Sequence, residues 1–116
     1  MKRIQFVSDR LVQQIIDGEK TASVCVLGEV DLDEDDYNHG LVVGDYYRVY
    51  NSELKPRCAI RITGMELCRW DDIPERLWQG ETNKNAEEFR VDHVEWFENP
   101  GPDYEFVAYY FELKKE

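Results

Sequence analysis

The order of hydrophobic and polar residues predicts three helices and four strands. The first helix is expected to begin after Ser8, a favourable N-cap, and to end at Gly18, which adopts the left-handed conformation easily. Four apolar residues share one face of this helix: Leu11, Val12, Ile15 and Ile16. An apolar stripe of this kind is typical of a helix that packs against a core.

Four later segments have the pattern of strands, with β-branched residues or alternating apolar and polar positions. They are residues 21–27, 46–51, 58–65 and 104–113. The third is expected to continue through residues 66–70 past an irregularity at Gly64.

Two more helices are expected between the third and fourth strands. Asp72 is the expected N-cap of the first, with Pro74 in its first turn and Leu77 and Trp78 facing inward. The other covers residues 85–98 and ends at an Asn-Pro-Gly-Pro sequence. It carries four ring-bearing side chains at helical spacing: Phe89, His93, Trp96 and Phe97.

Composition and length fit one folded domain over residues 1–116. The chain is 42% hydrophobic and 13% aromatic, which is enough for one core. We predict an α+β fold in which a curved, mixed, barrel-like sheet has helices packed at its ends. No apolar run approaches the roughly 20 residues of a membrane span, and no signal peptide is recognised.

The three cysteines, at positions 25, 58 and 68, are odd in number and show no Cys-x-x-Cys spacing. This pattern supports neither a disulfide framework nor a zinc site. We therefore expect a cytoplasmic protein without a cofactor or a metal. The acidic segment 29–40 is expected to be an exposed loop, because runs of like charge are usually solvated. A calcium site is not expected there, because the DLDEDD sequence lacks the glycine and the closing glutamate of an EF-hand.

The net charge is -11, from 25 acidic and 14 basic residues. An acidic surface repels a phosphate backbone, which argues against a long, non-specific nucleic-acid footprint. A small pocket for one nucleotide or one flipped base is still compatible with it, since stacking and hydrogen bonds dominate there.

Polar side chains cluster where the first helix meets the first strand. Lys20, Thr21 and Ser23 stand together there, and Lys20 and Ser23 can reach one pocket if Lys20 is still in the turn. A lysine that is partly desolvated can lose its proton and act as a base for a hydroxyl nucleophile. A surface lysine and a strand serine are also common in proteins without any such role.

Three segments resemble signatures of one family. GEKTAS at residues 18–23 resembles the G-x-K-T-x-S/T motif of activating signal cointegrator homology (ASCH) domains. LWQGETNKNAEEFRVDHVEWF is similar to a second motif of short bacterial ASCH proteins, with Gly80, Glu81, His93 and Phe97 at matching positions. VVGDYYRVYNS resembles the K-x-G-D strand of the family, and CAIRITGMELCRW resembles the I-x-I-T-x-V strand that follows it. The resemblance covers nearly the whole chain.

This resemblance implies a fold like that of PUA domains and a role in binding RNA or nucleosides. One branch of short bacterial members hydrolyses the acetyl amide of N4-acetylcytidine, using a lysine and a hydroxyl residue of the first motif and a glutamate of the second. The corresponding residues are Lys20, Ser23 and Glu81. Glu81 would orient the lysine or pass a proton to the leaving amine.

The chain departs from that branch at three places. Cys25 stands where the branch has arginine, the last strand lacks the acidic residue of the branch, and Gln79-Gly80-Glu81 replaces Glu-Gly-Glu. If the arginine of the branch holds the substrate in place, Arg61 or Arg69 would have to supply that positive charge in this chain. Cys25 is also an alternative nucleophile if Lys20 lowers the pKa of its thiol, whereas a buried structural cysteine is the simpler alternative.

The remaining candidates are ligand-binding residues. Trp70 and Trp78 flank the expected start of the second helix and are candidate cleft walls for stacking on a base. Thr21, Arg61 and His93 complete the candidate ligand-binding set, although His93 is equally suited to the edge of a core.

Three functional hypotheses follow. The first is an RNA- or nucleoside-binding ASCH domain with a cleft for a nucleobase-like ligand, whose partner is RNA or a modified nucleoside. The second is an amidohydrolase that acts on N4-acetylcytidine or a related small amide. The third is an acidic protein-interaction module. A membrane partner is not expected, and the sequence leaves the oligomeric state open.

Overall fold

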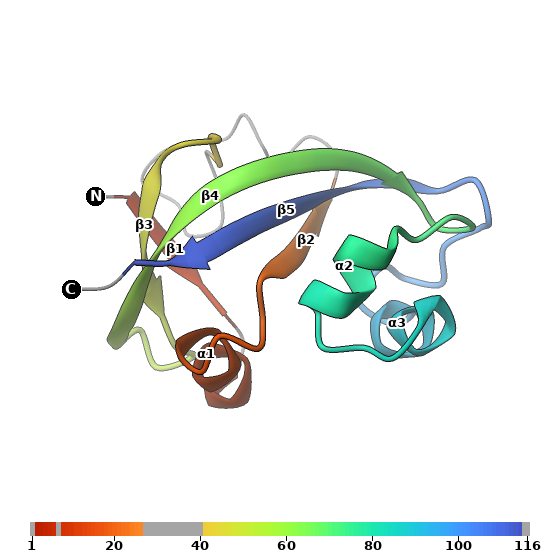
Figure 1. Cartoon of the computed structure of the whole chain (residues 1–116). Helices are drawn as coiled ribbons and strands as arrows, with labels where there is room; N and C mark the ends of the chain where they lie inside the picture. Colours follow the sequence, from red (N-terminus) through yellow and green to blue (C-terminus); the bar gives the residue numbers. More distant parts are fainter. Residues whose placement is uncertain (1, 7, 27–40, 115–116) are drawn as a thin grey trace.

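Five strands form one mixed sheet in the order β1-β3-β4-β5-β2 (Figure 1). The computed structural model describes residues 2–6, 8–26 and 41–114. The strands are β1 (Lys2–Gln5), β2 (Ala22–Val26), β3 (Tyr46–Tyr50), β4 (Pro56–Arg69) and β5 (Glu105–Leu113), and the helices are α1 (Asp9–Ile16), α2 (Glu75–Gly80) and α3 (Ala86–His93). β1 and β3 are parallel, and every other pair is antiparallel.

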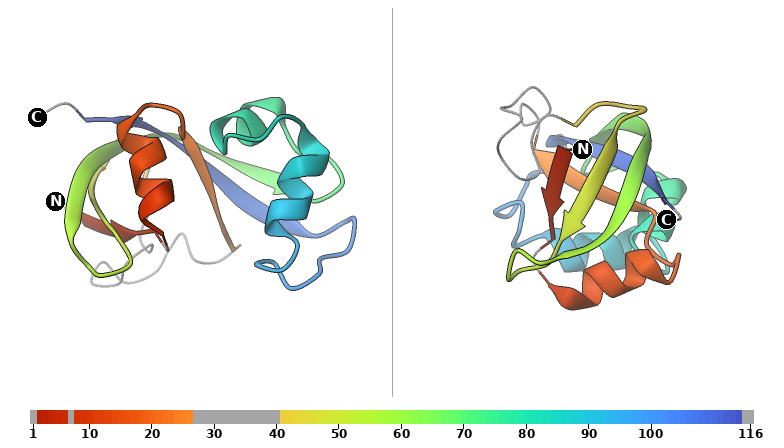
Figure 2. Two further views of the ribbon diagram at one scale, coloured as in Figure 1. Left: turned by 90° about the horizontal axis from the view of Figure 1, so that it is seen from below. Right: turned by 90° about the vertical axis from the view of Figure 1, so that its left-hand side faces the viewer.

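The sheet curls into a half-barrel, as Figure 2 shows from two directions. β4 is 14 residues long, and its pairing with β5 shifts register between Ile62 and Gly64. A bulge of this kind bends a strand and increases its twist. The predicted continuation past Gly64 and the predicted α+β fold with a curved sheet are therefore confirmed.

The strand β1 was not predicted from the sequence. Its four residues contain one apolar side chain, Ile4, which is fully buried. One apolar residue among polar neighbours produces no recognisable period, and β1 forms because parallel pairing with β3 satisfies its backbone.

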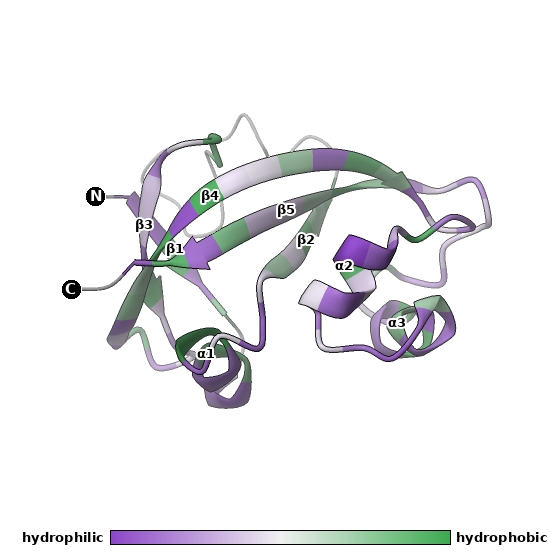
Figure 3. Ribbon diagram, viewed as in Figure 1, coloured by the Kyte–Doolittle hydropathy of each residue, from purple (hydrophilic) through white to green (hydrophobic). Residues whose placement is uncertain are grey.

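The first helix forms as its sequence predicts. The Ser8 hydroxyl accepts a hydrogen bond from the Leu11 N–H at 3.3 Å, and Gly18 has a φ of 79°. Figure 3 shows that α1 carries both hydrophobic and hydrophilic residues. The chain then turns so that Lys20 N–H donates to the Gln14 carbonyl at 3.0 Å, and β2 begins two residues later.

The other two helices differ from their predictions. Pro74 is the N-cap of α2 and no side chain caps it; the predicted cap, Asp72, instead forms a bridge with Arg69. The helix α3 ends at His93 although 85–98 was predicted. Residues Glu98 and Asn99 have φ values of 60° and 57° because the chain reverses there toward β5.

Two hydrophobic clusters fill opposite faces of β5. Val107, Tyr109 and Phe111 belong to a cluster with α1 and β3, while the alternate residues Phe106 and Ala108 belong to a cluster with α2 and α3. Successive residues of a strand point to opposite faces, so β5 is buried on both sides. This position accounts for its continuous run of apolar and aromatic residues.

The strand β2 lies at the edge of the sheet, between the two groups of helices. Figure 1 shows α1 under one end of the sheet and α2 with α3 under the other, with β2 between them. Side chains from both helical groups can therefore meet along the outer edge of β2. None of the helices in the described segments is long and apolar enough to cross a membrane.

The end of α2 touches the start of β2. Thr21 N–H donates to the Gly80 carbonyl at 2.9 Å. A Cβ on Gly80 would lie 2.6 Å from the Cβ of Ala22 and 3.1 Å from its backbone nitrogen. Only glycine allows this approach, which places the next residue, Glu81, beside the chain that enters β2.

We expect Gly80→Ala to lower the free energy of unfolding by about 1–3 kcal/mol, because the added methyl forces α2 away from β2. Urea unfolding measures the change. Gly101→Ala is the control: Gly101 is exposed, its nearest contact would be at 3.4 Å, and we expect a change within about 0.5 kcal/mol. Equal stability of Gly80→Ala and the wild type would contradict the close approach.

Candidate functional site

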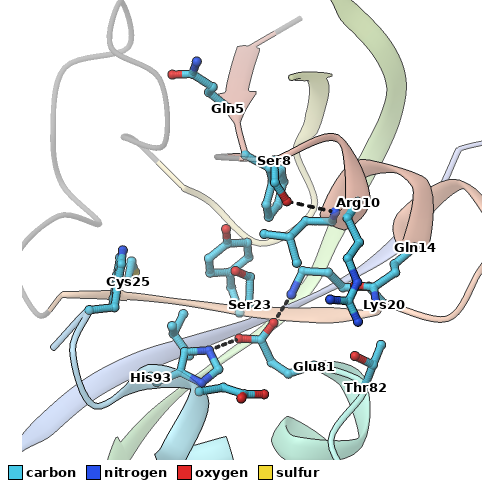
Figure 4. A pocket seen from close by; sticks show the side chains of 16 residues that line it. Gln5, Ser8, Arg10, Gln14, Lys20, Ser23, Cys25, Glu81, Thr82 and His93 are labelled. Carbon is cyan, nitrogen blue, oxygen red and sulfur yellow. Dashed lines mark hydrogen bonds and ion pairs between the residues drawn. The ribbon is translucent and has the colours of Figure 1, made fainter. Parts of the chain in front are cut away.

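A cavity of about 570 Å³ lies along the edge of β2. Side chains from β1, α1, β2, α3, β5 and the α2–α3 connection line it. Figure 4 shows Lys20, Glu81 and His93 pointing toward one another inside it, with Ser23 nearby. The cavity thus joins residues that are far apart in the sequence.

Lys20 is buried at the base of this cavity, with 3% of its surface exposed. Its Nζ donates a hydrogen bond to the Ala22 carbonyl at 2.7 Å and forms an ion pair with Glu81 Oε1. The side chain of Glu81 is 6% exposed. Burial lowers the pKa of Lys20 to about 7, so the amine can exist without its proton near neutral pH.

His93 holds the other oxygen of the same carboxylate. Its Nε2 lies 2.8 Å from Glu81 Oε2, and its Nδ1 lies 2.8 Å from the Phe89 carbonyl oxygen. The imidazole stacks on the Phe89 ring at a centroid distance of 4.0 Å. Burial is the main cause that lowers the pKa of His93. Glu81 therefore bridges Lys20 and His93.

Three element ends bring this cluster together. Lys20 lies in the turn between α1 and β2, Glu81 caps the C-terminus of α2, and His93 is the last residue of α3. Thr82, which follows Glu81 and also lines the cavity, has a φ of 67°. A β-branched residue in the left-handed region costs about 1–2 kcal/mol, and local strain of this kind is common at functional sites.

The structure gathers part of the predicted site. Lys20, Ser23, Glu81 and His93 line one cavity, and Cys25 also lines it while being 3% exposed. The condition that Lys20 must lie in the turn for it and Ser23 to reach one pocket is met, because β2 begins at Ala22.

Four other candidates lie outside this cavity. Thr21 is exposed and lines a more open hollow beside α2, and Arg61 donates to the Gly44 carbonyl at 3.4 Å. Trp70 packs edge-on against Phe97 at a centroid distance of 5.9 Å. Trp78 is half-buried against the same core, so neither tryptophan walls this cavity. Arg69, the other cation considered, pairs with Asp71.

Several lining residues were not predicted, most notably Arg10 and Trp96. Arg10 is exposed, and among the described residues it has no ion-pair partner. Trp96 is 51% exposed, although helical spacing placed it with the buried rings. For Arg10 a sequence signal was available, because its i, i+4 spacing with Gln14 places both polar residues on one side of α1. For Trp96 none was available, because the sequence predicted a helix to residue 98 and α3 ends at His93.

Within the described segments, no three His, Cys, Asp or Glu side chains gather in a way that could hold a metal ion. The acidic segment 29–40, with the DLDEDD sequence, lies outside the described residues. The residues that line the cavity can donate and accept hydrogen bonds, stack on a ring, transfer protons and, through Ser23 or Cys25, supply a nucleophile.

A family model for the ASCH domain matches residues 2–114. ASCH domains are generally regarded as RNA-associated. No curated protein sequence matches the chain.

Solved structures of similar fold cover almost the whole chain. An ASCH domain from Lactobacillus crispatus JV V101 has a TM-score of 0.76 and 20% identity over 96% of this chain and 79% of its own. Protein EF3133 from Enterococcus faecalis V583 has a TM-score of 0.70 and 21% identity over 98% and 77%. The hypothetical protein PH0355 has a TM-score of 0.60 and 16% identity over 98% and 100%. The PUA-like fold expected from the resemblance is confirmed.

We expect the Lys20 amine to make stability rise with pH. In the unfolded chain its pKa is about 10.5 and in the folded protein about 7, so between these values the unfolded state binds one more proton. The free energy of unfolding then increases by about 1.4 kcal/mol per pH unit from this group, and the increase is absent below pH 7. Urea unfolding of the wild type and of Lys20→Met between pH 7 and pH 9 measures it. Parallel curves for the two proteins would contradict the lowered pKa.

Proposed function

The chain belongs to the ASCH domain family, and from that premise we propose that its cavity binds a nucleobase or nucleoside-like group of RNA. The observation that carries the proposal is the cavity of about 570 Å³ with the buried Lys20–Glu81–His93 cluster inside it. Sites for small organic ligands have volumes of about 300–1,000 Å³ and contain a few convergent polar groups. This cavity has both properties.

The lining groups match the chemistry of a base. Lys20, the Ser23 hydroxyl and the carboxylate of Asp92 supply donors and acceptors for hydrogen bonds to a base edge. Trp96 lines the cavity and is about half exposed, so its ring is accessible for stacking. Stacking of a base on an aromatic side chain contributes about 1–3 kcal/mol.

The net charge of the protein favours recognition of a single nucleotide over binding along many phosphates. A net charge of -11 opposes binding along a phosphate backbone. Arg10 lines the cavity as an exposed guanidinium without an ion-pair partner in the described segments, so it is available to one phosphate. Arg10 replaces Arg61 and Arg69 in this role.

We expect nucleosides to shift the amide signals of Ser23 and Thr82 and the indole signal of Trp96 in ¹H–¹⁵N NMR spectra. Cytidine, N4-acetylcytidine, uridine, adenosine and guanosine are titrated separately. Lys20→Met should weaken binding by roughly tenfold or more, because a hydrogen bond to a charged or polar buried partner is lost.

Lys84→Met is the matched control for this titration. Lys84 is an exposed lysine that does not line the cavity, and we expect its loss to leave binding unchanged. Shifts that cluster away from the cavity, or no shifts at millimolar nucleoside, would overturn the proposal. Binding to a basic protein with no response to nucleosides would favour the acidic protein-interaction module instead.

A second candidate function is hydrolysis of N4-acetylcytidine or a related small amide. The observation that favours it is the lowered pKa of Lys20, about 7, in a cavity that also contains the Ser23 hydroxyl. A buried free amine can accept a proton from a nucleophile near neutral pH. Glu81 orients the amine through its Oε1.

The reaction consumes one water and yields cytidine and acetate. Lys20 takes the proton of the attacking oxygen, from Ser23 or from water, and a C–O bond forms at the acetyl carbon. The C–N4 bond then breaks, and the proton held by Lys20 goes to the leaving amine. If Ser23 attacks, water hydrolyses the acetyl ester in a second step.

We expect N4-acetylcytidine to be converted to cytidine, as followed by chromatography, and Lys20→Met to slow conversion by about 10²-fold or more. Ser23→Ala separates the two nucleophiles: an acetyl-enzyme seen by mass spectrometry in the wild type and lost in Ser23→Ala identifies serine. No conversion at high protein concentration would exclude this function and leave the binding proposal standing.

A further inference from the structure

Each ring nitrogen of His93 faces an oxygen atom that can accept a hydrogen bond. The Phe89 carbonyl oxygen, 2.8 Å from Nδ1, can only accept, so Nδ1 carries a proton. The Glu81 carboxylate, 2.8 Å from Nε2, also only accepts when it is ionised. A neutral imidazole has one N–H, and with an ionised Glu81 it would place a lone pair against an oxygen lone pair.

The contacts of Lys20 fit an amine with two hydrogens. Within the described part of the chain, Nζ has two acceptors, the Ala22 carbonyl and Glu81 Oε1. A neutral amine uses its two N–H bonds on these acceptors and keeps a lone pair. An ammonium would have a third N–H directed past the ring of Phe6, 5.9 Å away, or into the cavity, in a side chain that is 2% exposed.

We infer that the proton ordinarily assigned to Lys20 lies in the hydrogen bond between Glu81 Oε2 and His93 Nε2. Lys20 then holds two protons and is neutral, His93 Nδ1 holds one, and Glu81 and His93 share one. Below about pH 7 the number of protons and the net charge equal those of an ammonium, a carboxylate and a neutral imidazole. Above that pH the cluster has lost the shared proton and holds one proton fewer than the unfolded chain. His93 is thus a positioning residue that acts on Lys20 through Glu81.

The surroundings support this distribution. Phe89 stacks on His93 and Phe6 lies beside Lys20, so a shared proton between two buried groups avoids separated charges in an apolar setting. The other charged groups that line the cavity are Asp92 and Arg10. Burial lowers the pKa of His93, whereas its hydrogen bond to the Phe89 carbonyl and the negative charge of Asp92 act in the opposite direction. Asp92 also accepts a hydrogen bond from Asn83 at 2.8 Å.

The consequence for the proposed function is a free amine that faces the cavity without any change of pH. Its lone pair can accept a hydrogen bond from a base or take a proton from a nucleophile. This consequence rests on the proposed function, whereas the position of the proton does not. A measurement of the protons alone therefore tests the inference even if no nucleoside binds.

The experiment uses NMR of the whole chain labelled with ¹⁵N and with ¹³C at lysine Cε. We expect both ring nitrogens of His93 to show protonated-type ¹⁵N shifts at pH 6, below the pH at which the cluster loses its shared proton. In His93→Gln the amide still donates a hydrogen bond to Glu81 but shares no proton. Glu81 then carries a full charge, and the pKa of Lys20, from the Cε titration, should rise by about one unit or more.

Glu95→Gln is the matched control, because Glu95 is an exposed acid two residues beyond His93, the last residue of α3, and it does not line the cavity. Its loss should leave the Lys20 titration unchanged. An unprotonated Nε2 in wild-type His93, or an unchanged Lys20 titration in a folded His93→Gln, overturns the inference. Nucleoside titration of the same samples shows separately whether the proposed function holds.

Discussion

The structure of the site depends on one contact, the pairing of the Lys20 amine with the Glu81 carboxylate away from water. Two ionisable groups that are buried together are costly unless their hydrogen bonds are satisfied. Here the Ala22 carbonyl and His93 satisfy the remaining positions. The pairing exists because α2 approaches β2 at Gly80, where any larger residue would collide with Ala22. A steric constraint between a helix end and a strand therefore sets the chemistry of the cavity.

The edge position of β2 explains why the cavity forms where it does. The sheet has one hydrophobic cluster on each face of β5, and each cluster is covered by its own helices. The two groups of helices approach one another at the edge strand β2, and side chains from both groups line the cavity between them. An acidic protein can thus keep a cavity whose electrostatics differ from those of its surface, because the few charged groups that line it act at close range.

Local rules predicted most of the fold. The Ser8 cap, the Gly18 end of α1 and the irregularity at Gly64 all depend on residues within a few positions, and all were predicted from the sequence. The predictions that were wrong concern features that depend on contacts between residues far apart in the sequence. Residues Lys2–Gln5 form a strand through pairing with β3, more than forty positions away. α3 ends early because the chain reverses toward β5, which turns Trp96 outward and buries Phe97.

The order and types of the residues already indicated which groups were candidates for chemistry. They pointed to Lys20, Ser23, Glu81 and His93, whose motifs resemble those of ASCH domains. The folded chain was needed to show that these four share a cavity with Arg10 and Trp96, while Thr21, Arg61, Trp70 and Trp78 lie outside it. The reason is physical: a motif records order along one chain, whereas a cavity is made by the packing of element ends that the motif does not describe. The protonation state of Lys20 also depends on the folded structure, because it follows from burial and from the partners of Glu81.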